Sequence, residues 1–338
     1  MILEKNTTAA CQPAPVCCPS GHPLKVSRFL LASAFSGCLM LLTGCEAPLN
    51  LSDVEKEREN PVRRTDQIQA LTLNSSLQVA VGNDGLILTR QTSQSPWQRR
   101  ILDGAPNLID VDTCPDGSLI ALSFEREIWH ADAEAQQWTR HALPTPENML
   151  AATCAPDGSF WAVGSFSTLM VSRDAGNSWS ETSLNEDAML SSIQFVDPQT
   201  ALMTGEFGLV ARTEDGGRNW QTLDYIPNDF YPLDAYFSSP GRGWVVGLDG
   251  MILHTSDGGA SWQQEHTPVA APLYGISHTG TGLFATGENG TLLTREDSVW
   301  RRLSVDTGPV WLRSLIELDD GELLVAGGNG TLTSVHTQ

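Results

Sequence analysis

The chain has 338 residues, and its 40 aspartates and glutamates outnumber its 20 lysines and arginines, which gives a net charge of −20 at pH 7. Such an acidic protein repels nucleic-acid phosphates and anionic lipid headgroups, so we expect no nucleic-acid binding, and attachment to a membrane would need a covalent anchor. The length suits one large all-β domain with additional segments.

The first 45 residues differ from the rest of the chain. Residues 1–24 are rich in proline and cysteine, which indicates a disordered leader or a misassigned start codon. Lys25 and Arg28 then precede an apolar run over 29–42, and residues 42–45 are Leu-Thr-Gly-Cys. This order resembles the signal peptide of bacterial lipoproteins, which implies acylation of the cysteine. We therefore predict a signal peptide over 25–45 and lipidation at Cys45. The mature protein would then lie on the periplasmic side of a bacterial membrane, inner or outer. An ordinary cleaved signal or an uncleaved anchor is the alternative.

Residues 46–60 are polar, which predicts a flexible tether. After this segment, one sequence unit repeats seven times. A small turn residue recurs every 40–42 positions, at Gly82, Ser123, Gly164, Gly205, Gly247, Gly287 and Gly327. A tryptophan repeats with a similar period, at Trp97, Trp138, Trp179, Trp220, Trp262 and Trp300. A period near 40 with four short strands per unit is typical of a β-propeller. We predict an all-β, seven-bladed propeller of four-stranded blades over 61–338.

The seventh unit ends at Gln338 without a fourth strand. Residues 61–64 (Pro-Val-Arg-Arg) resemble Trp300-Arg301-Arg302, which precede the first strand of the seventh unit. We therefore predict that residues 61–65 form the outer strand of the seventh blade. That strand would close the ring and remove an open sheet edge.

Three units contain the pattern [ST]-x-D-x-G-x-x-W. Its residues are Asp174, Gly176, Trp179, Asp215, Gly217, Trp220, Asp257, Gly259 and Trp262. The carboxylate and the hydroxyl of such a motif bind backbone N–H groups of their own turn, glycine permits a positive φ, and tryptophan anchors the next strand. The pattern predicts a hairpin staple rather than a catalytic site.

The repeat resembles the propellers of the photosystem II stability and assembly factors, within the Asp-box or bacterial neuraminidase repeat superfamily. The resemblance rests on Val-x-Gly, an apolar strand and the T-x-D-G-G-x-x-W motif, and it covers residues 61–338. It implies a lumenal or periplasmic scaffold that binds a membrane-protein subunit during assembly. It does not imply a photosynthetic role.

An enzyme is the alternative, because sialidases also contain Asp-boxes. Their chemistry needs three arginines around a carboxylate, together with a tyrosine nucleophile and its glutamate partner. Near the predicted inner strands there is only Arg313, with Arg126 on a loop. The histidines show no ligand spacing, and no glycine-rich loop opens a helix. We predict no enzyme activity, no metal site and no cofactor.

The predicted partner is a membrane-associated protein bound by a monomeric propeller. The longest inter-blade loop, 225–232, is rich in aromatics, and further aromatics occur in turns of the same face. The predicted partner-binding residues are Tyr225, Phe230, Tyr231, Trp311, Phe207 and Phe166. The alternative is that these side chains cap the interfaces between blades.

Two cysteines follow the signal segment, at the ends of the first strands of neighbouring blades. Cys114 and Cys154 lie 40 residues apart, and an exported domain favours a disulfide between them. Because adjacent blades could hold the two Cα atoms too far apart, a pair of buried thiols is the alternative.

Overall fold

The computed structural model of the protein describes residues 51–318 and 321–336. The predicted leader, the signal peptide and Cys45 lie outside the described residues. Within the segment expected to be a flexible tether, α2 (Ser52–Glu59) is a highly charged helix without buried residues. Among the helices of the described ranges, none has the length and apolar content to cross a membrane.

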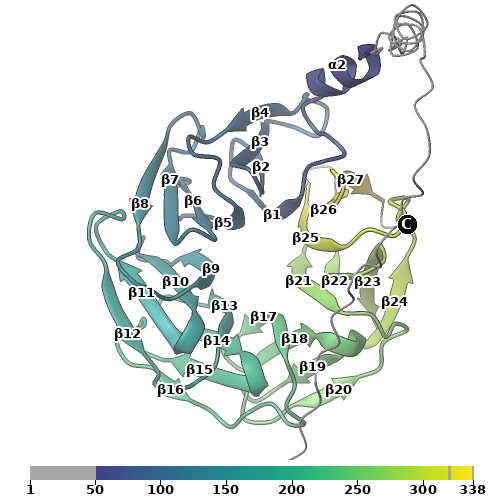
Figure 1. The fold of residues 1–338 in the computed structure, drawn as a ribbon. Helices are drawn as coiled ribbons and strands as arrows, with labels where there is room; N and C mark the ends of the chain where they lie inside the picture. Colours follow the sequence, from purple (N-terminus) through teal and green to yellow (C-terminus); the bar gives the residue numbers. More distant parts are fainter. Residues whose placement is uncertain (1–50, 319–320, 337–338) are drawn as a thin grey trace, which may run out of the picture. The chain divides into compact units, whose positions relative to one another are not determined.

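Seven antiparallel sheets form a ring (Figure 1), as the repeat predicts. In each blade the strands, called A to D here, run in chain order from the centre outward. Blades 1 to 3 are β1 (Ile68–Leu73), β2 (Gln78–Gly82), β3 (Leu86–Arg90), β4 (Gln98–Ile101); β5 (Leu108–Thr113), β6 (Leu119–Ser123), β7 (Glu127–Ala131), β8 (Trp138–Ala142); β9 (Met149–Cys154), β10 (Phe160–Gly164), β11 (Thr168–Ser172), β12 (Ser180–Ser183). Blades 4 to 7 are β13 (Leu190–Phe195), β14 (Ala201–Gly205), β15 (Leu209–Thr213), β16 (Gln221–Thr222); β17 (Pro232–Ser239), β18 (Arg242–Gly247), β19 (Ile252–Thr255), β20 (Gln263–Glu265); β21 (Leu273–Thr279), β22 (Gly282–Gly287), β23 (Thr291–Glu296), β24 (Val299–Leu303); β25 (Leu312–Glu317), β26 (Leu323–Gly327), β27 (Leu332–Val335).

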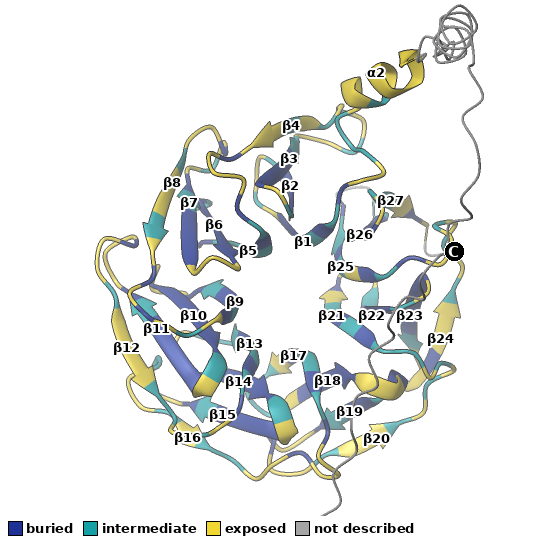
Figure 2. Cartoon of the chain, in the orientation of Figure 1, coloured by how far each residue is buried: buried dark blue, intermediate teal, exposed yellow. Residues whose placement is uncertain are grey.

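Burial follows the position of each strand in its blade, as Figure 2 shows. The B strands are buried along nearly their whole length, whereas the D strands β4 and β12 are mostly exposed. A B strand lies in the middle of a sheet that packs on a neighbouring blade through each face, so both of its faces carry apolar residues. The core is therefore a series of apolar layers between the blades.

The repeated glycine ends strand B where strand A contains an irregularity in its pairing. A Cβ on Gly205 would lie 2.4 Å from the backbone oxygen of Met189, and one on Gly247 would lie 2.2 Å from that of Tyr231. Because backbone atoms cannot yield as a flexible side chain can, glycine recurs here once per blade. Blade 2 is the exception and has the fully buried Ser123.

The seventh blade corrects one prediction. In the described residues it has three strands, and residues 61–65 form turns rather than its fourth strand. The N–H of Gly330 donates to the oxygen of Asp66, as that of Gly290 donates to the oxygen of Val310 in blade 6. Residues 63–66 thus correspond to the loop that precedes a strand A, and the prediction that residues 61–65 form an outer strand was wrong.

Blades 7 and 1 close the ring by packing and by polar contacts. The N–H of Leu71 in β1 donates to Ser314 Oγ in β25 over 3.0 Å, and Val62 packs on an apolar cluster shared by the two blades. The buried Asp66 forms an ion pair with Arg99 at 2.7 Å. Residues just before β1 therefore help to join the ends of the propeller without adding a strand.

The three Asp-box turns have the predicted structural role. Asp257 Oδ1 accepts from Thr255 Oγ1 at 2.8 Å and from the N–H of Ser261 at 2.8 Å. The N–H of Gly259 donates to Thr255 Oγ1, and the indole N–H of Trp262 donates to the oxygen of Gly259. Hydrogen bonds donated to their carboxylates, chiefly by the side chains of Ser261 and Asn219, lower the pKa of Asp257 and of Asp215 to about 2. The carboxylates therefore act as turn staples.

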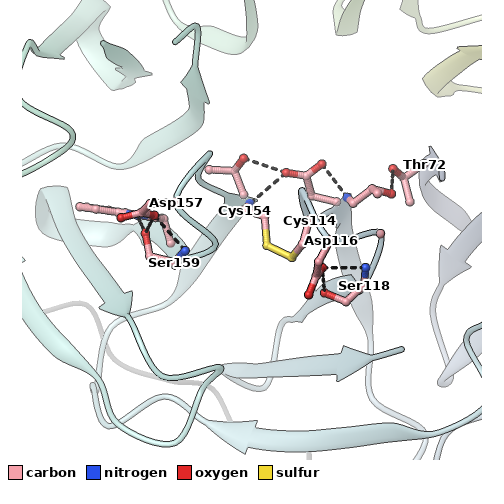
Figure 3. The surroundings of a disulfide bond; sticks show 12 residues. Thr72, Cys114, Asp116, Ser118, Cys154, Asp157 and Ser159 are labelled. Atoms are coloured by element: carbon pink, nitrogen blue, oxygen red, sulfur yellow. Dashed lines mark hydrogen bonds between the residues drawn. A yellow bond between two sulfur atoms is a disulfide. The ribbon is translucent and has the colours of Figure 1, made fainter. Parts of the chain in front are cut away.

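Cys114 and Cys154 form a disulfide between blades 2 and 3 (Figure 3), which confirms that prediction. Their Cα atoms are 5.0 Å apart. Strands A converge at the centre of the ring, so the ends of β5 and β9 come closer together than the outer strands do. Asp112 adds a second connection, because its Oδ2 accepts from the N–H of Cys154 at 3.0 Å.

Candidate protein-binding face

The turns between strands B and C and the loops between strands D and A share one face of the ring, called the top face here. Backbone hydrogen bonds join the two sets: the N–H of Ser167 donates to the oxygen of Ala188, and the N–H of Ile226 donates to the oxygen of Gly208. The face predicted to bind a partner is thus a single surface built from consecutive blades.

In six of the seven B–C turns, all of them described, the second residue after the one that ends strand B has a left-handed backbone conformation. In blades 1, 6 and 7 it is Asp84, Asn289 or Asn329, with φ of 57°, 57° and 55°. Aspartate and asparagine tolerate this region, whereas larger side chains are strained there. Blades 3 and 4 nevertheless place Phe166 (φ 51°) and Phe207 (φ 59°) at this position.

The two phenylalanines are also exposed to solvent. Phe166 is 57% exposed and Phe207 is 54% exposed. Phe124 and Leu248, which directly follow the small residue at the end of strand B in blades 2 and 5, are 53% and 42% exposed. Four consecutive blades therefore each present a large apolar side chain on the top face. Strained backbone that displays an apolar side chain to water favours a binding role over a packing role.

Two tyrosines join the loop 225–232 to the neighbouring loop and turn of the top face. Tyr225, which is 46% exposed, donates to Glu186 Oε2 at 3.0 Å, and the half-buried Tyr231 donates to Glu206 Oε1 at 2.7 Å. Burial, reinforced by the hydrogen bond to Glu206, raises the pKa of Tyr231 to about 12, and burial together with the hydrogen bond to Glu186 raises the pKa of Tyr225. Both phenols remain hydrogen-bond donors that hold the two carboxylates in place.

Two predicted partner-binding residues lie elsewhere. Phe230 is only 2% exposed and packs with Ile226, Val245 and Leu253 between blades 4 and 5, so the prediction that a partner contacts it was wrong. The prolines and neighbouring aromatics made this loop look like a uniformly exposed segment, but one ring turns into the core. Trp311 is half-buried just before β25 of blade 7, where its indole faces Gly328, and it does not join the exposed apolar side chains of blades 2 to 5.

The centre of the ring contains a cavity of about 300 Å³ lined by the A strands. Its carboxylates are engaged by backbone N–H groups of the next blade: Asp110 Oδ2 accepts from Ala152 and Asp234 Oδ2 accepts from Ile276, each at 2.9 Å. The channel-facing edge of an A strand has unpaired N–H groups, and these side chains satisfy them. Burial raises the pKa of Asp110 to about 7 and that of Asp234 to about 6, opposed by these hydrogen bonds.

The cavity does not have the composition of a sialidase site. Of the described residues that line it, Arg313 is the single arginine, and it donates to Gln69 Oε1 at 3.2 Å. The three-arginine cluster required for that chemistry is therefore not present in the central pocket, and the sialidase-like alternative is not favoured. Within the described ranges, no three His, Cys, Asp or Glu side chains come together as a possible metal site.

The repeat region matches the sequence profile of a known protein family. The profile of the family described as Photosynthesis system II assembly factor YCF48 matches residues 130–228 and 225–309, more than half of the chain. The chain belongs to this family. The resemblance inferred from the Asp-box repeats is thereby confirmed. No curated protein sequence matches the chain.

Solved structures show the same fold at low sequence identity. The structure of YCF48 bound to D1 peptide is 15% identical with a TM-score of 0.66, over 82% of this chain and 94% of that one. YCF48 from Cyanidioschyzon merolae is 13% identical with a TM-score of 0.66, over 82% and 96%. A virginiamycin B lyase from Staphylococcus aureus is 14% identical with a TM-score of 0.69, over 80% and 94%. Since binding proteins and lyases share the fold, its function must be argued from the site.

Sequence reasoning missed two features of this propeller. The channel carboxylates lie on A strands, where alternation alone does not distinguish a residue facing the channel from one facing the next blade. Phe124 and Leu248 each follow the small residue that ends strand B, and alignment of the seven units at that residue would have revealed both.

Proposed function

We propose that this protein is an exported, lipid-anchored and non-catalytic propeller that binds a protein partner at a membrane and assists its assembly. Membership of the assembly-factor family supports a binding role. One of the similar structures is YCF48 with a bound D1 peptide, and a peptide or protein is the corresponding ligand class for this chain. The proposal includes no photosynthetic partner.

The observation that carries the proposal is the pair of exposed phenylalanines in left-handed turns. At the equivalent positions Asn289 and Asn329 fulfil the backbone requirement without exposing an aromatic ring. Phe166 and Phe207 therefore cost conformational energy and apolar exposure that the fold does not require. Aromatic side chains that are exposed in the free protein and buried on binding are frequent hot spots.

The double variant Phe166→Asn/Phe207→Asn should separate binding from folding. Asparagine tolerates a left-handed position. We therefore expect a free energy of unfolding that is equal to that of the wild type or up to about 1 kcal/mol higher. Loss of a hot spot should weaken partner binding by about 2 kcal/mol or more, roughly 30-fold. The measurements are thermal unfolding and cross-linked recovery of partners from membranes, quantified by mass spectrometry.

Val299→Thr is the matched control, because Val299 is 48% exposed at the start of the outer strand β24, beside the C–D turn and away from the top face. It makes an exposed apolar side chain polar at nearly constant volume and should leave partner recovery unchanged. If the double asparagine variant recovers the same proteins in the same amounts as the wild type, the proposed binding face is incorrect.

The lipid anchor is tested independently at Cys45. Acyl chains on this cysteine would hold the protein at the membrane at about 0.8 kcal/mol per buried methylene. We expect Cys45→Ser to abolish lipid labelling and to leave the protein soluble or unprocessed, whereas Cys38→Ser in the same segment should behave as the wild type. Fractionation and metabolic labelling with a fatty acid give the readout, and membrane attachment that survives Cys45→Ser contradicts the anchor.

A further inference from the structure

The exposed apolar side chains of blades 3 to 5 are surrounded by negative charge on the top face. The loops and turns of blades 3 to 5 on this face (165–167, 184–189, 206–208, 223–231, 248–250 and 266–272), all described, contain no lysine or arginine. Their carboxylates are Glu186, Asp187, Glu206, Asp224, Asp229 and Asp249. The rest of the face differs, because Arg63, Arg64 and Arg126 lie among its loops.

We propose that this sector, defined by Phe166, Phe207, Tyr225, Leu248 and these six carboxylates, docks a cationic amphipathic segment of the partner protein. The inference rests on the proposed function and adds the chemistry of the ligand. The segment would place apolar side chains on the phenylalanines and lysines or arginines against the surrounding acids. Charge complementarity of this kind directs encounter and selects among partners.

The carboxylates are positioned for such a contact. Asp187, Asp224, Asp229 and Asp249 are exposed, while Glu186 and Glu206 are held by the hydroxyls of Tyr225 and Tyr231. Asp249 occupies the left-handed position of its turn, with a φ of 56°, and it follows the exposed Leu248. Acidic groups and apolar side chains thus alternate across three neighbouring blades.

Other occupants of the sector fit less well. A second copy of the chain would bring six carboxylates of the same sign to the interface in a symmetric dimer, which is unfavourable. An anionic lipid surface would meet the same repulsion. A neutral apolar peptide would bury the phenylalanines but would offer no positive charge to the exposed aspartates. A positively charged segment with apolar side chains satisfies both features.

A synthetic peptide of leucines and lysines in helical spacing is the probe, with a leucine–glutamate peptide of the same spacing for comparison. The site variant is Asp187→Asn/Asp229→Asn/Asp249→Asn, in which asparagine preserves the left-handed backbone of residues 229 and 249. The matched control is Asp84→Asn/Asp103→Asn/Asp306→Asn, three exposed acids of the same face in blade 1 and in the loops that follow blades 1 and 6. Both triple variants change the net charge by the same amount.

At low salt we expect the site variant to bind the lysine peptide at least tenfold more weakly than the wild type, and the control variant to differ less than twofold. The leucine–glutamate peptide should not bind. Equal weakening by both triple variants would show general attraction to an acidic protein and would overturn the inference, as would equal binding of the two peptides.

The Phe166→Asn/Phe207→Asn variant separates this inference from the proposed function. We expect it to weaken binding of the lysine peptide as well, because the apolar half of the contact is lost. If it reduces partner recovery from membranes while the aspartate variant leaves the lysine peptide's affinity unchanged, a partner binds there but is not cationic. That result overturns the inference and leaves the proposed function intact.

Discussion

Replacing Phe230 with alanine is expected to destabilise the propeller by about 3–4 kcal/mol, the usual cost of emptying a buried aromatic site. The ring packs with Val210, Ile226, Val245 and Leu253 and is 2% exposed. A Cβ on Gly247 would lie 2.8 Å from its Cζ, which shows how closely the backbone of β18 approaches. Denaturant unfolding of the two purified proteins measures the difference.

Tyr225→Ala in the same loop is the control. Tyr225 is 46% exposed, and its loss removes one hydrogen bond to Glu186 without a core cavity. Its cost should be about 1 kcal/mol or less. Similar small effects of both substitutions would mean that Phe230 does not belong to the core between blades 4 and 5. Partner recovery per folded molecule should be unaffected by Phe230→Ala, in contrast to the phenylalanines of the turns.

Breaking the bridge between Cys114 and Cys154 is expected to cost about 4 kcal/mol, because it releases a loop with a sequence separation of 40 residues in the unfolded chain. The bridge joins the inner strands of blades 2 and 3, so its loss should lower the midpoint of denaturant unfolding. The measurement compares the protein before and after treatment with a reductant under otherwise equal conditions.

The variant Cys114→Ala/Cys154→Ala identifies the source of that effect. It should have the stability of the reduced wild type, apart from the small change in side-chain volume, and it should not respond to the reductant. Thiol labelling of the unfolded, unreduced propeller should find neither cysteine free. Two labelled thiols, or a wild-type stability that is indifferent to the reductant, would contradict the disulfide.

The stability effects expected for Phe230→Ala and for loss of the disulfide both depend on side chains that meet across a boundary between two blades. The sequence places Phe230 only two residues from Asn228, in a segment with the composition of an exposed loop. Its burial depends on Val210 of blade 4 and Val245 of blade 5, which are distant in the sequence. Local composition contains no signal for a contact of this kind.

The sequence by itself determined the number of blades and the chemistry of the turns. The glycine at the end of strand B recurs because a Cβ would meet the backbone of its own blade, and Asp257 binds groups within four residues of itself. Interactions this local repeat whenever the local sequence repeats, so a period near 40 residues is enough to predict the architecture.

The tertiary structure alone decided how the blades meet. In the structure Phe230 is buried and Phe166 is exposed, and the Cα atoms of Cys114 and Cys154 lie 5.0 Å apart. It also assigned residues 63–66 to an inter-blade loop through the contact between Gly330 and Asp66. The physical reason is that a side chain is buried or exposed according to the neighbouring blade that faces it, and this neighbour belongs to another repeat whose packing no local pattern specifies.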